Sequence, residues 1–128
     1  MRERILLVED EQSILEIMQK VLESHGYRVN FLTRGAKALE FIAVELPDLV
    51  VLDMLLPDKN GDQICHEIKS NPTLKNIPVL MTTGFPQEDI EANATVEYLR
   101  PNAYLRKPFT IEDLMAKIRE LLSYQKFE

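Results

Sequence analysis

The sequence predicts an α/β fold in which five parallel strands form one sheet and helices cover both of its faces. Short apolar runs alternate five times with longer stretches whose apolar residues recur at helical spacing. The apolar runs are continuous rather than alternating, which is typical of strands buried on both faces. The length of 128 residues, with 45% hydrophobic and 28% charged residues, suits one globular domain spanning residues 1–128.

Five apolar runs predict the strands. They cover residues 5–8, 27–32, 49–52, 77–81 and 103–105. Polar residues follow the first, third, fourth and fifth runs at their carboxyl ends. In chain order, these residues are Glu9 and Asp10, then Asp53, then Thr82 and Thr83, and finally Arg106 and Lys107.

The stretches between these runs predict five helices. Apolar residues at helical spacing lie within 14–22, 36–43, 64–68, 92–99 and 114–122. Gly26 follows the first stretch, as is common at a helix C-terminus, and Pro47 limits the second. Pro86 and Glu88 suit the first turn of the fourth helix. Thr110 opens an incomplete capping box before the last helix.

Five consecutive strand–helix units with right-handed crossovers leave few topologies open. We expect a flavodoxin-like (βα)5 three-layer sandwich with sheet order 2-1-3-4-5, where the strands are numbered along the chain. Ligands of such sheets bind at the carboxyl ends of the strands, near the point where the first and third strands are neighbours. The polar residues that follow the strands would therefore share one rim.

The composition excludes several classes of function. Fifteen Lys and Arg against 21 Asp and Glu give a net charge of −6, so we expect no direct nucleic-acid binding by this chain. The single cysteine, Cys65, cannot form an internal disulfide, which suits a reducing compartment. The N-terminus lacks a signal-peptide core, and no stretch approaches the ~18 apolar residues of a membrane span. We therefore expect a cytoplasmic protein that does not bind a membrane.

Three carboxylates on the shared rim predict a metal site. Glu9, Asp10 and Asp53 follow neighbouring strands, and three carboxylates held close together would resist ionising. A hard divalent cation relieves this repulsion, and Mg²⁺ is commonly held by one or two carboxylates together with waters and a phosphate. The cluster therefore predicts a Mg²⁺ site that a phosphoryl group completes.

Asp53 is the preferred nucleophile of this cluster because it follows the central strand. A carboxylate can attack phosphorus to form an aspartyl phosphate, and a metal would shield the charges of both groups. An ammonium group and a hydroxyl would bind the remaining phosphoryl oxygens. Lys107 and Thr83 supply them.

With these residues, the chain resembles over its whole length the receiver domain of two-component response regulators, of the chemotaxis-regulator type. The motifs are, in order, Val8-Glu9-Asp10-Glu11, Leu52-Asp53-Met54-Leu55-Leu56-Pro57, Gly61, Thr83-Gly84 and Lys107-Pro108-Phe109. Gly61 lies eight residues after Asp53, and Thr83 lies thirty residues after it. Each motif alone is weak, but their order and their positions at strand ends are specific.

The resemblance implies a role for each acid. Asp53 matches the phosphoacceptor and would also bind the metal. Asp10 matches a direct metal ligand, and Glu9 matches the acid that acts through water. The backbone carbonyl of Leu55 would complete the protein ligands of Mg²⁺.

The resemblance also implies a switch. Thr83 matches the switch hydroxyl, Lys107 the phosphate-binding ammonium, and Tyr104 the aromatic residue that changes rotamer. The family often has a cis peptide at the position of Lys107–Pro108, which only proline makes inexpensive.

These roles imply a regulatory phosphoacceptor rather than an enzyme, although the domain would assist its own phosphorylation and dephosphorylation. A histidine kinase or a histidine phosphotransfer protein would phosphorylate Asp53. The face formed by the fourth helix, the last strand and the last helix would then change its preference for a downstream output domain or protein. This change would be a population shift.

The chain departs from the family pattern on that face. Residues 100–103 read Arg-Pro-Asn-Ala where many receivers have a small Gly-Ala turn, and the span from Thr83 to Lys107 is slightly longer than usual. Two further positions flank the path of the attacking water in this family. They hold Leu55 and Phe85, and neither side chain can orient water, so we expect slow self-dephosphorylation.

Five other residues have simpler explanations. Only one of two successive threonines can face the site, so we expect Thr82 to be structural. Cys65 is expected in the core, and Arg106 at a solvated strand end. His25 and His66 have no second histidine at ligand spacing, so we expect surface or cap residues.

Three alternative functions are open at this stage. A pseudo-receiver would bind partners without being phosphorylated. A flavin-phosphate binder would need phosphate-binding amides after the first strand, where residues 9–11 are acidic. An aspartate phosphatase usually has its nucleophile there and a second Asp two residues later, but Gln12 occupies that position. The kinase, the signal, the output and homodimerisation are not predicted, nor is whether the chain stands alone or belongs to a longer regulator or hybrid kinase.

Overall fold

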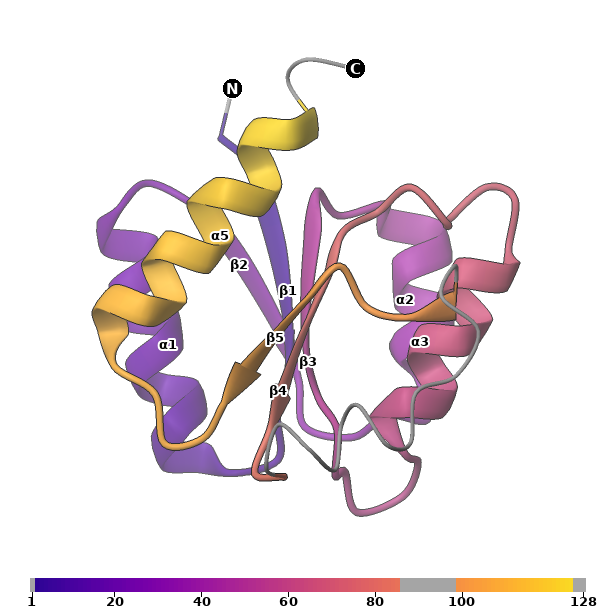
Figure 1. Ribbon diagram of the computed structural model, residues 1–128, viewed down its shortest axis with the longest axis horizontal. Helices are drawn as coiled ribbons and strands as arrows, with labels where there is room; N and C mark the ends of the chain where they lie inside the picture. Colours follow the sequence, from indigo (N-terminus) through magenta and orange to yellow (C-terminus); the bar gives the residue numbers. More distant parts are fainter. Residues whose placement is uncertain (1, 86–98, 126–128) are drawn as a thin grey trace.

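The computed structural model describes residues 2–85 and 99–125 and confirms the three-layer α/β architecture (Figure 1). The elements in chain order are β1 (Arg4–Val8), α1 (Gln12–Ser24), β2 (Arg28–Leu32), α2 (Ala38–Glu45), β3 (Leu49–Asp53), α3 (Gly61–Ser70), β4 (Val79–Thr83), β5 (Ala103–Arg106) and α5 (Ile111–Gln125). Apart from its last residue, the predicted fourth helix lies outside the described residues. In the described part of the chain, no helix has the length and apolar character needed to cross a bilayer.

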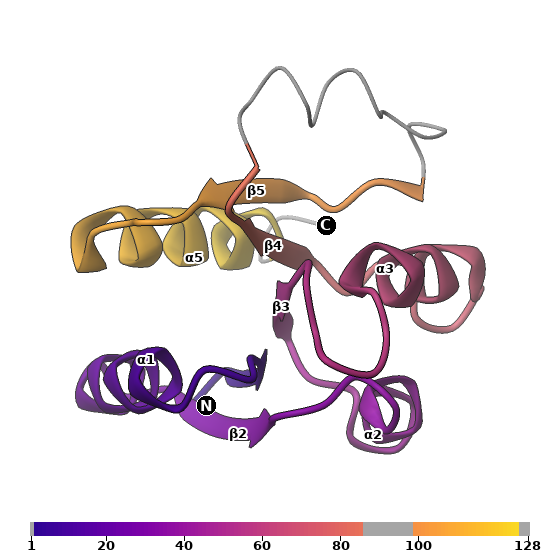
Figure 2. The same cartoon turned by 90° about the horizontal axis from the view of Figure 1, so that it is seen from below.

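The strands form one parallel sheet in the order β2-β1-β3-β4-β5, which confirms the predicted topology. Helices α1 and α5 cover one face, and α2 and α3 cover the other (Figure 2). Each face has its own apolar core: in β1, Ile5 and Leu7 belong to one core, whereas Leu6 and Val8 belong to the other. Burial on both faces is the reason why the strands read as continuous apolar runs.

The fourth strand differs from its predicted bounds. It begins at Val79, immediately after Pro78, because proline has no N–H to donate to a strand ladder. It continues through Thr82 and Thr83, which were expected to follow the strand. Asp53 is likewise the last residue of β3 rather than the first residue after it, and it pairs with Thr82. Asp53 and Thr83 therefore belong to the strands themselves.

Local signals at the helix ends are confirmed. Gly26 follows α1 in the left-handed region, with φ +91°. His25 is the C-cap residue of α1, is exposed, and has its Nδ1 2.8 Å from the carbonyl oxygen of Val21, as expected for a surface or cap histidine. The hydroxyl of Thr110 accepts the N–H of Asp113 at 3.1 Å and caps the start of α5.

A buried lysine ties the end of α3 to the sheet. The Nζ of Lys69 donates to the carbonyl oxygens of Lys75 (3.1 Å) and Ile77 (2.9 Å), and to Oδ1 of Asn102 (2.7 Å). The same Asn102 oxygen accepts the N–H of Val79 at 2.9 Å. Burial lowers the pKa of Lys69, while the three acceptors satisfy its ammonium group. This network gives a structural reason for the unusual turn before β5.

Replacing Lys69 with methionine would leave these acceptors without their donor. We expect Lys69→Met to lower the free energy of unfolding by about 2–4 kcal/mol, measured by urea denaturation. Lys75→Met is the matched control, because Lys75 is exposed and only its backbone joins the network; its effect should stay below about 0.5 kcal/mol. Equal effects of the two substitutions would contradict the structural role of Lys69.

Candidate phosphoacceptor and metal site

The carboxyl ends of β1 and β3 bring the three predicted acids together. Glu9 and Asp10 follow β1, and Asp53 ends β3. Glu9 is 2% exposed and Asp53 is 6% exposed, whereas Asp10 is exposed. One carboxylate oxygen from each acid lies within 4.8 Å of those of the other two. The sheet topology therefore produces the predicted acidic cluster.

Lys107 lies between the two buried acids. Its Nζ donates to Oε1 of Glu9 at 2.8 Å and to Oδ2 of Asp53 at 3.3 Å. Burial alone would lower the pKa of Lys107, but the hydrogen bond to Glu9 and the charge of Asp53 raise it above its usual value. The lysine therefore stays charged and compensates part of the negative charge of the cluster.

The two buried acids have opposite pKa shifts. Burial, together with the hydrogen bond and charge interaction with Glu9, raises the pKa of Asp53 to about 7. Burial also acts to raise the pKa of Glu9, but hydrogen bonds with Lys107, Asp53 and the N–H of Glu11 outweigh it and bring the pKa below its usual value. Without a metal, a proton on Asp53 is therefore favoured below about pH 7.

This donor set fits a divalent cation. It offers hard carboxylate oxygens, and the exposure of Asp10 leaves one side of the cluster accessible to water. Burial and the neighbouring Glu9 raise the pKa of Asp53, and the charge of Lys107 offsets this rise only in part. Binding of a cation would favour the ionised carboxylate and displace its proton.

The loop between β3 and α3 is held close to Asp53. A Cβ at Gly61 would overlap the carbonyl oxygen of Asp53, so only glycine fits there. The N–H of Gly61 donates to the carbonyl of Met54 at 2.8 Å. Within the same loop, the N–H of Leu55 donates to Oδ1 of Asp53 at 3.3 Å. The loop thus orients the Asp53 carboxylate through its backbone.

Asp58 was not singled out from the sequence, yet it anchors this loop to the loop before α2. Its two carboxylate oxygens accept the N–H groups of Gly35 and Ala36, each at 2.8 Å. These hydrogen bonds, led by the one from Gly35, lower the pKa of Asp58. The Pro57-Asp58 pair signals a turn, but its partners lie 22 and 23 residues away, which local sequence does not indicate.

The two predicted switch residues lie on the neighbouring strands β4 and β5. The hydroxyl of Thr83 accepts the N–H of Phe85 at 3.0 Å and lies 3.6 Å from Sδ of Met54. Thr82 and Thr83 are equally buried. The side-chain contact of Thr83 with Met54, in the loop after Asp53, is what distinguishes the two threonines. Tyr104 is half-buried against the core beside α2 and α3, and burial raises its pKa.

The remaining expectations are largely met. Cys65 is fully buried, and burial raises its pKa to about 12, so its thiol is a core group rather than a nucleophile. Arg106 is exposed, and the Lys107–Pro108 peptide is cis. His66 is only partly a surface residue: its side chain is 33% exposed, but Nε2 is buried and has no hydrogen bond within the described structure.

Comparison with known proteins identifies the family. The family model described as response regulator receiver domain matches residues 5–119, and the chain belongs to this family. The response regulator MprA of Mycobacterium ulcerans is 34% identical over 125 residues, which are 98% of this chain and 52% of that protein. The chain thus spans about half the length of the curated relatives it matches.

Solved receiver structures have the same fold. A response regulator receiver domain protein from Methanospirillum hungatei JF-1 superposes with a TM-score of 0.84 at 28% identity, covering 98% of each chain. The receiver domain of sensor histidine kinase PA1611 from Pseudomonas aeruginosa PAO1 superposes with a TM-score of 0.85 at 25% identity, covering 96% of this chain and 99% of that chain. That structure has a magnesium ion coordinated in its active-site cleft.

The pKa of Asp53 leads to a pH-dependent stability. The pKa of Asp53 is about 7 in the folded protein, whereas the usual value is 3.8, so between these pH values the folded protein binds more protons than the unfolded chain. Folding stability therefore falls as pH rises through this window. Asp53→Asn removes this penalty. In the absence of divalent metal we expect the variant to be more stable than wild type at pH 8, by on the order of 2 kcal/mol, with the difference shrinking toward pH 4.

Urea denaturation in EDTA at several pH values measures this difference. Asp10→Asn is the matched control, because it removes an exposed carboxylate from the same cluster and should have a smaller effect. Parallel stability–pH curves for wild type and Asp53→Asn would contradict the raised pKa.

Proposed function

We propose that this receiver domain, spanning residues 1–128, is a phosphoacceptor switch in which Asp53 receives the phosphoryl group. The observation that carries the proposal is the placement of Asp53 at the end of the central strand, with Oδ2 3.3 Å from Nζ of Lys107. Glu9 is a weaker candidate because it is more deeply buried and makes the shorter contact with Lys107. Asp10 is exposed and makes no contact with Lys107.

The donor in this proposal is the phosphohistidine of a histidine kinase or histidine phosphotransfer protein. An oxygen of Asp53 forms a bond to phosphorus while the bond between phosphorus and the histidine nitrogen breaks, and the electron pair stays on that nitrogen. Lys107 is already hydrogen-bonded to Asp53 and would bind one transferred phosphoryl oxygen. The Thr83 hydroxyl would donate to another.

The metal in this proposal is Mg²⁺. Asp10, Asp53 and the backbone carbonyl of Leu55 would hold it directly, and Glu9 would act through water. When bound, it would neutralise charge on the carboxylates and on the phosphoryl group. The three acids that converge within 4.8 Å support this assignment.

The proposed output is a change in partner preference. Movement of the Thr83 hydroxyl toward the phosphoryl group would break its contact with Met54, and Tyr104 would take up the space that this movement leaves. Of the proposed signalling face, β5 and α5 lie within the described residues and the fourth helix does not. Because the matched relatives are about twice as long, we propose a separate output region or protein as the partner, acting in the cytoplasm.

Phosphorylation is tested with acetyl phosphate and Mg²⁺. We expect one phosphoryl adduct by intact-mass measurement, which requires Mg²⁺ and is absent from Asp53→Asn. Asp113→Asn is the matched control, since it removes an exposed carboxylate on α5 that is not in the cluster. An adduct that persists in Asp53→Asn would overturn the assignment of Asp53. A wild type that neither reacts nor binds Mg²⁺ would favour the pseudo-receiver.

The lifetime of the phosphoryl group gives a second prediction. Leu55 and Phe85 are 59% and 41% exposed beside the site, and neither carries a group that can orient water. We expect Leu55→Asn and Phe85→Asn each to accelerate loss of the phosphoryl group, by about tenfold, followed by intact mass over time. Leu46→Asn changes an equally exposed leucine at the end of α2 and should leave the rate unchanged. Equal acceleration by all three variants would contradict the proposal.

A further inference from the structure

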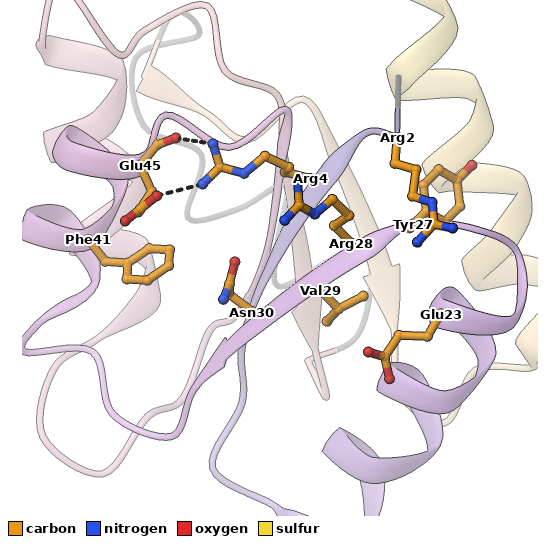
Figure 3. A pocket seen from close by; sticks show the side chains of 9 residues that line it. All are labelled: Arg2, Arg4, Glu23, Tyr27, Arg28, Val29, Asn30, Phe41 and Glu45. Carbon is orange, nitrogen blue, oxygen red and sulfur yellow. Dashed lines mark hydrogen bonds and ion pairs between the residues drawn. The ribbon is translucent and has the colours of Figure 1, made fainter.

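An open cavity of about 670 Å³ lies beside the edge strand β2, at the end of the sheet opposite Asp53 (Figure 3). Its walls come from the starts of β1 and β2 and from the ends of α1 and α2. Three arginines line it: Arg2, Arg4 and Arg28. The same three, together with the acids Glu3 and Asp48, line a second hollow of about 700 Å³ next to it. This concentration is notable because the whole chain has a net charge of −6.

The arginines are forced together by the sheet. Arg4 and Arg28 are register partners on β1 and β2, so their side chains leave the sheet on the same face. Like charges at neighbouring positions of adjacent strands repel each other. The ladder therefore places two like charges side by side at the edge of the cavity.

The acids around the cavity compensate only part of this charge. Arg4 contacts Glu45 at 2.7 Å and also donates to the carbonyl oxygen of Glu45 at 2.8 Å. Glu23 lines the cavity as well, but within residues 2–85 and 99–125 neither Arg2 nor Arg28 forms an ion pair with it or with any other carboxylate. Two exposed guanidinium groups thus remain beside the cavity without an ion pair in this part of the chain.

The chemistry of these groups favours phosphate. A guanidinium presents parallel N–H donors whose spacing matches two phosphate oxygens, and two guanidiniums suit a ligand with more than one phosphate. The volume lies in the range of small-molecule cavities. Two half-buried aromatic rings, Tyr27 and Phe41, line opposite sides of the cavity, with Asn30 between them (Figure 3).

We propose that this cavity is a binding site for a small polyphosphate anion, whose phosphates are bound by Arg2 and Arg28. The shared chemistry is a short chain of phosphate groups, which a nucleoside triphosphate and inorganic polyphosphate both carry. The site is remote from Asp53 and does not depend on the proposed phosphorylation. A bound ligand would stabilise the folded protein by mass action.

The proposal is tested by titrating the ¹⁵N-labelled full chain with inorganic tripolyphosphate and, separately, with ATP, both in EDTA at low ionic strength. We expect saturable amide shifts at residues 2–4 and 27–30 with at least one of the two. Stronger binding of ATP, with added shifts at Tyr27 or Phe41, would identify a nucleotide as the source. Stronger or equal binding of tripolyphosphate would identify the inorganic anion.

Matched arginine variants test the assignment to the cavity. Arg28→Gln should weaken binding by about tenfold, because it removes one charge-assisted donor pair. Arg119→Gln removes an exposed arginine on α5 and should leave the affinity unchanged. The proposal is overturned if millimolar ligand gives no saturable shifts at the cavity, if the shifts are confined to Glu9, Asp53 and Lys107, or if both variants weaken binding equally.

Discussion

The burial of two carboxylates beside each other is the constraint on which this site depends. Glu9 and Asp53 end up adjacent because β1 and β3 are neighbours and both strands run toward the same rim. Lys107 reaches this pair from the end of β5, 98 residues after Glu9 and 54 residues after Asp53 in the chain. One ammonium balances only one of the two charges, and burial together with the charge of Glu9 raises the pKa of Asp53. In the proposed function, a bound divalent cation would neutralise the remaining negative charge.

The same parallel ladder organises charge at both ends of the sheet. At the carboxyl ends it collects acids around one lysine, and at the amino ends it places Arg4 beside Arg28. A parallel arrangement brings like ends of strands together, so residues that are distant in the chain become neighbours. The two ends therefore differ in charge. The acids at the carboxyl ends suit a cation, and the arginines at the amino ends suit an anion.

Supporting interactions hold the loops around the site in place. Gly61 lets the loop after β3 approach the Asp53 carbonyl, and Asp58 fixes that loop to the loop before α2. Lys69 and Asn102 join the end of α3 to the starts of β4 and β5. Asp58 and Lys69 each form hydrogen bonds with groups from other segments of the chain. These hydrogen bonds favour one arrangement of the loops.

The sequence by itself determined that five strands form, and the acids, threonine and lysine near their ends, because continuous apolar runs and the residues that end them are local patterns. The order of the strands was predicted from the right-handed crossovers of consecutive strand–helix units, and the structure has that order. The sequence also indicated Gly26 and Thr110, whose effects extend over one turn. Only the tertiary structure decided which polar residues hold the loops together, since Asp58 and Lys69 act on partners from other elements. It alone placed Arg4 beside Arg28. Register and side-chain contacts arise when distant segments pack, and no local pattern carries that information.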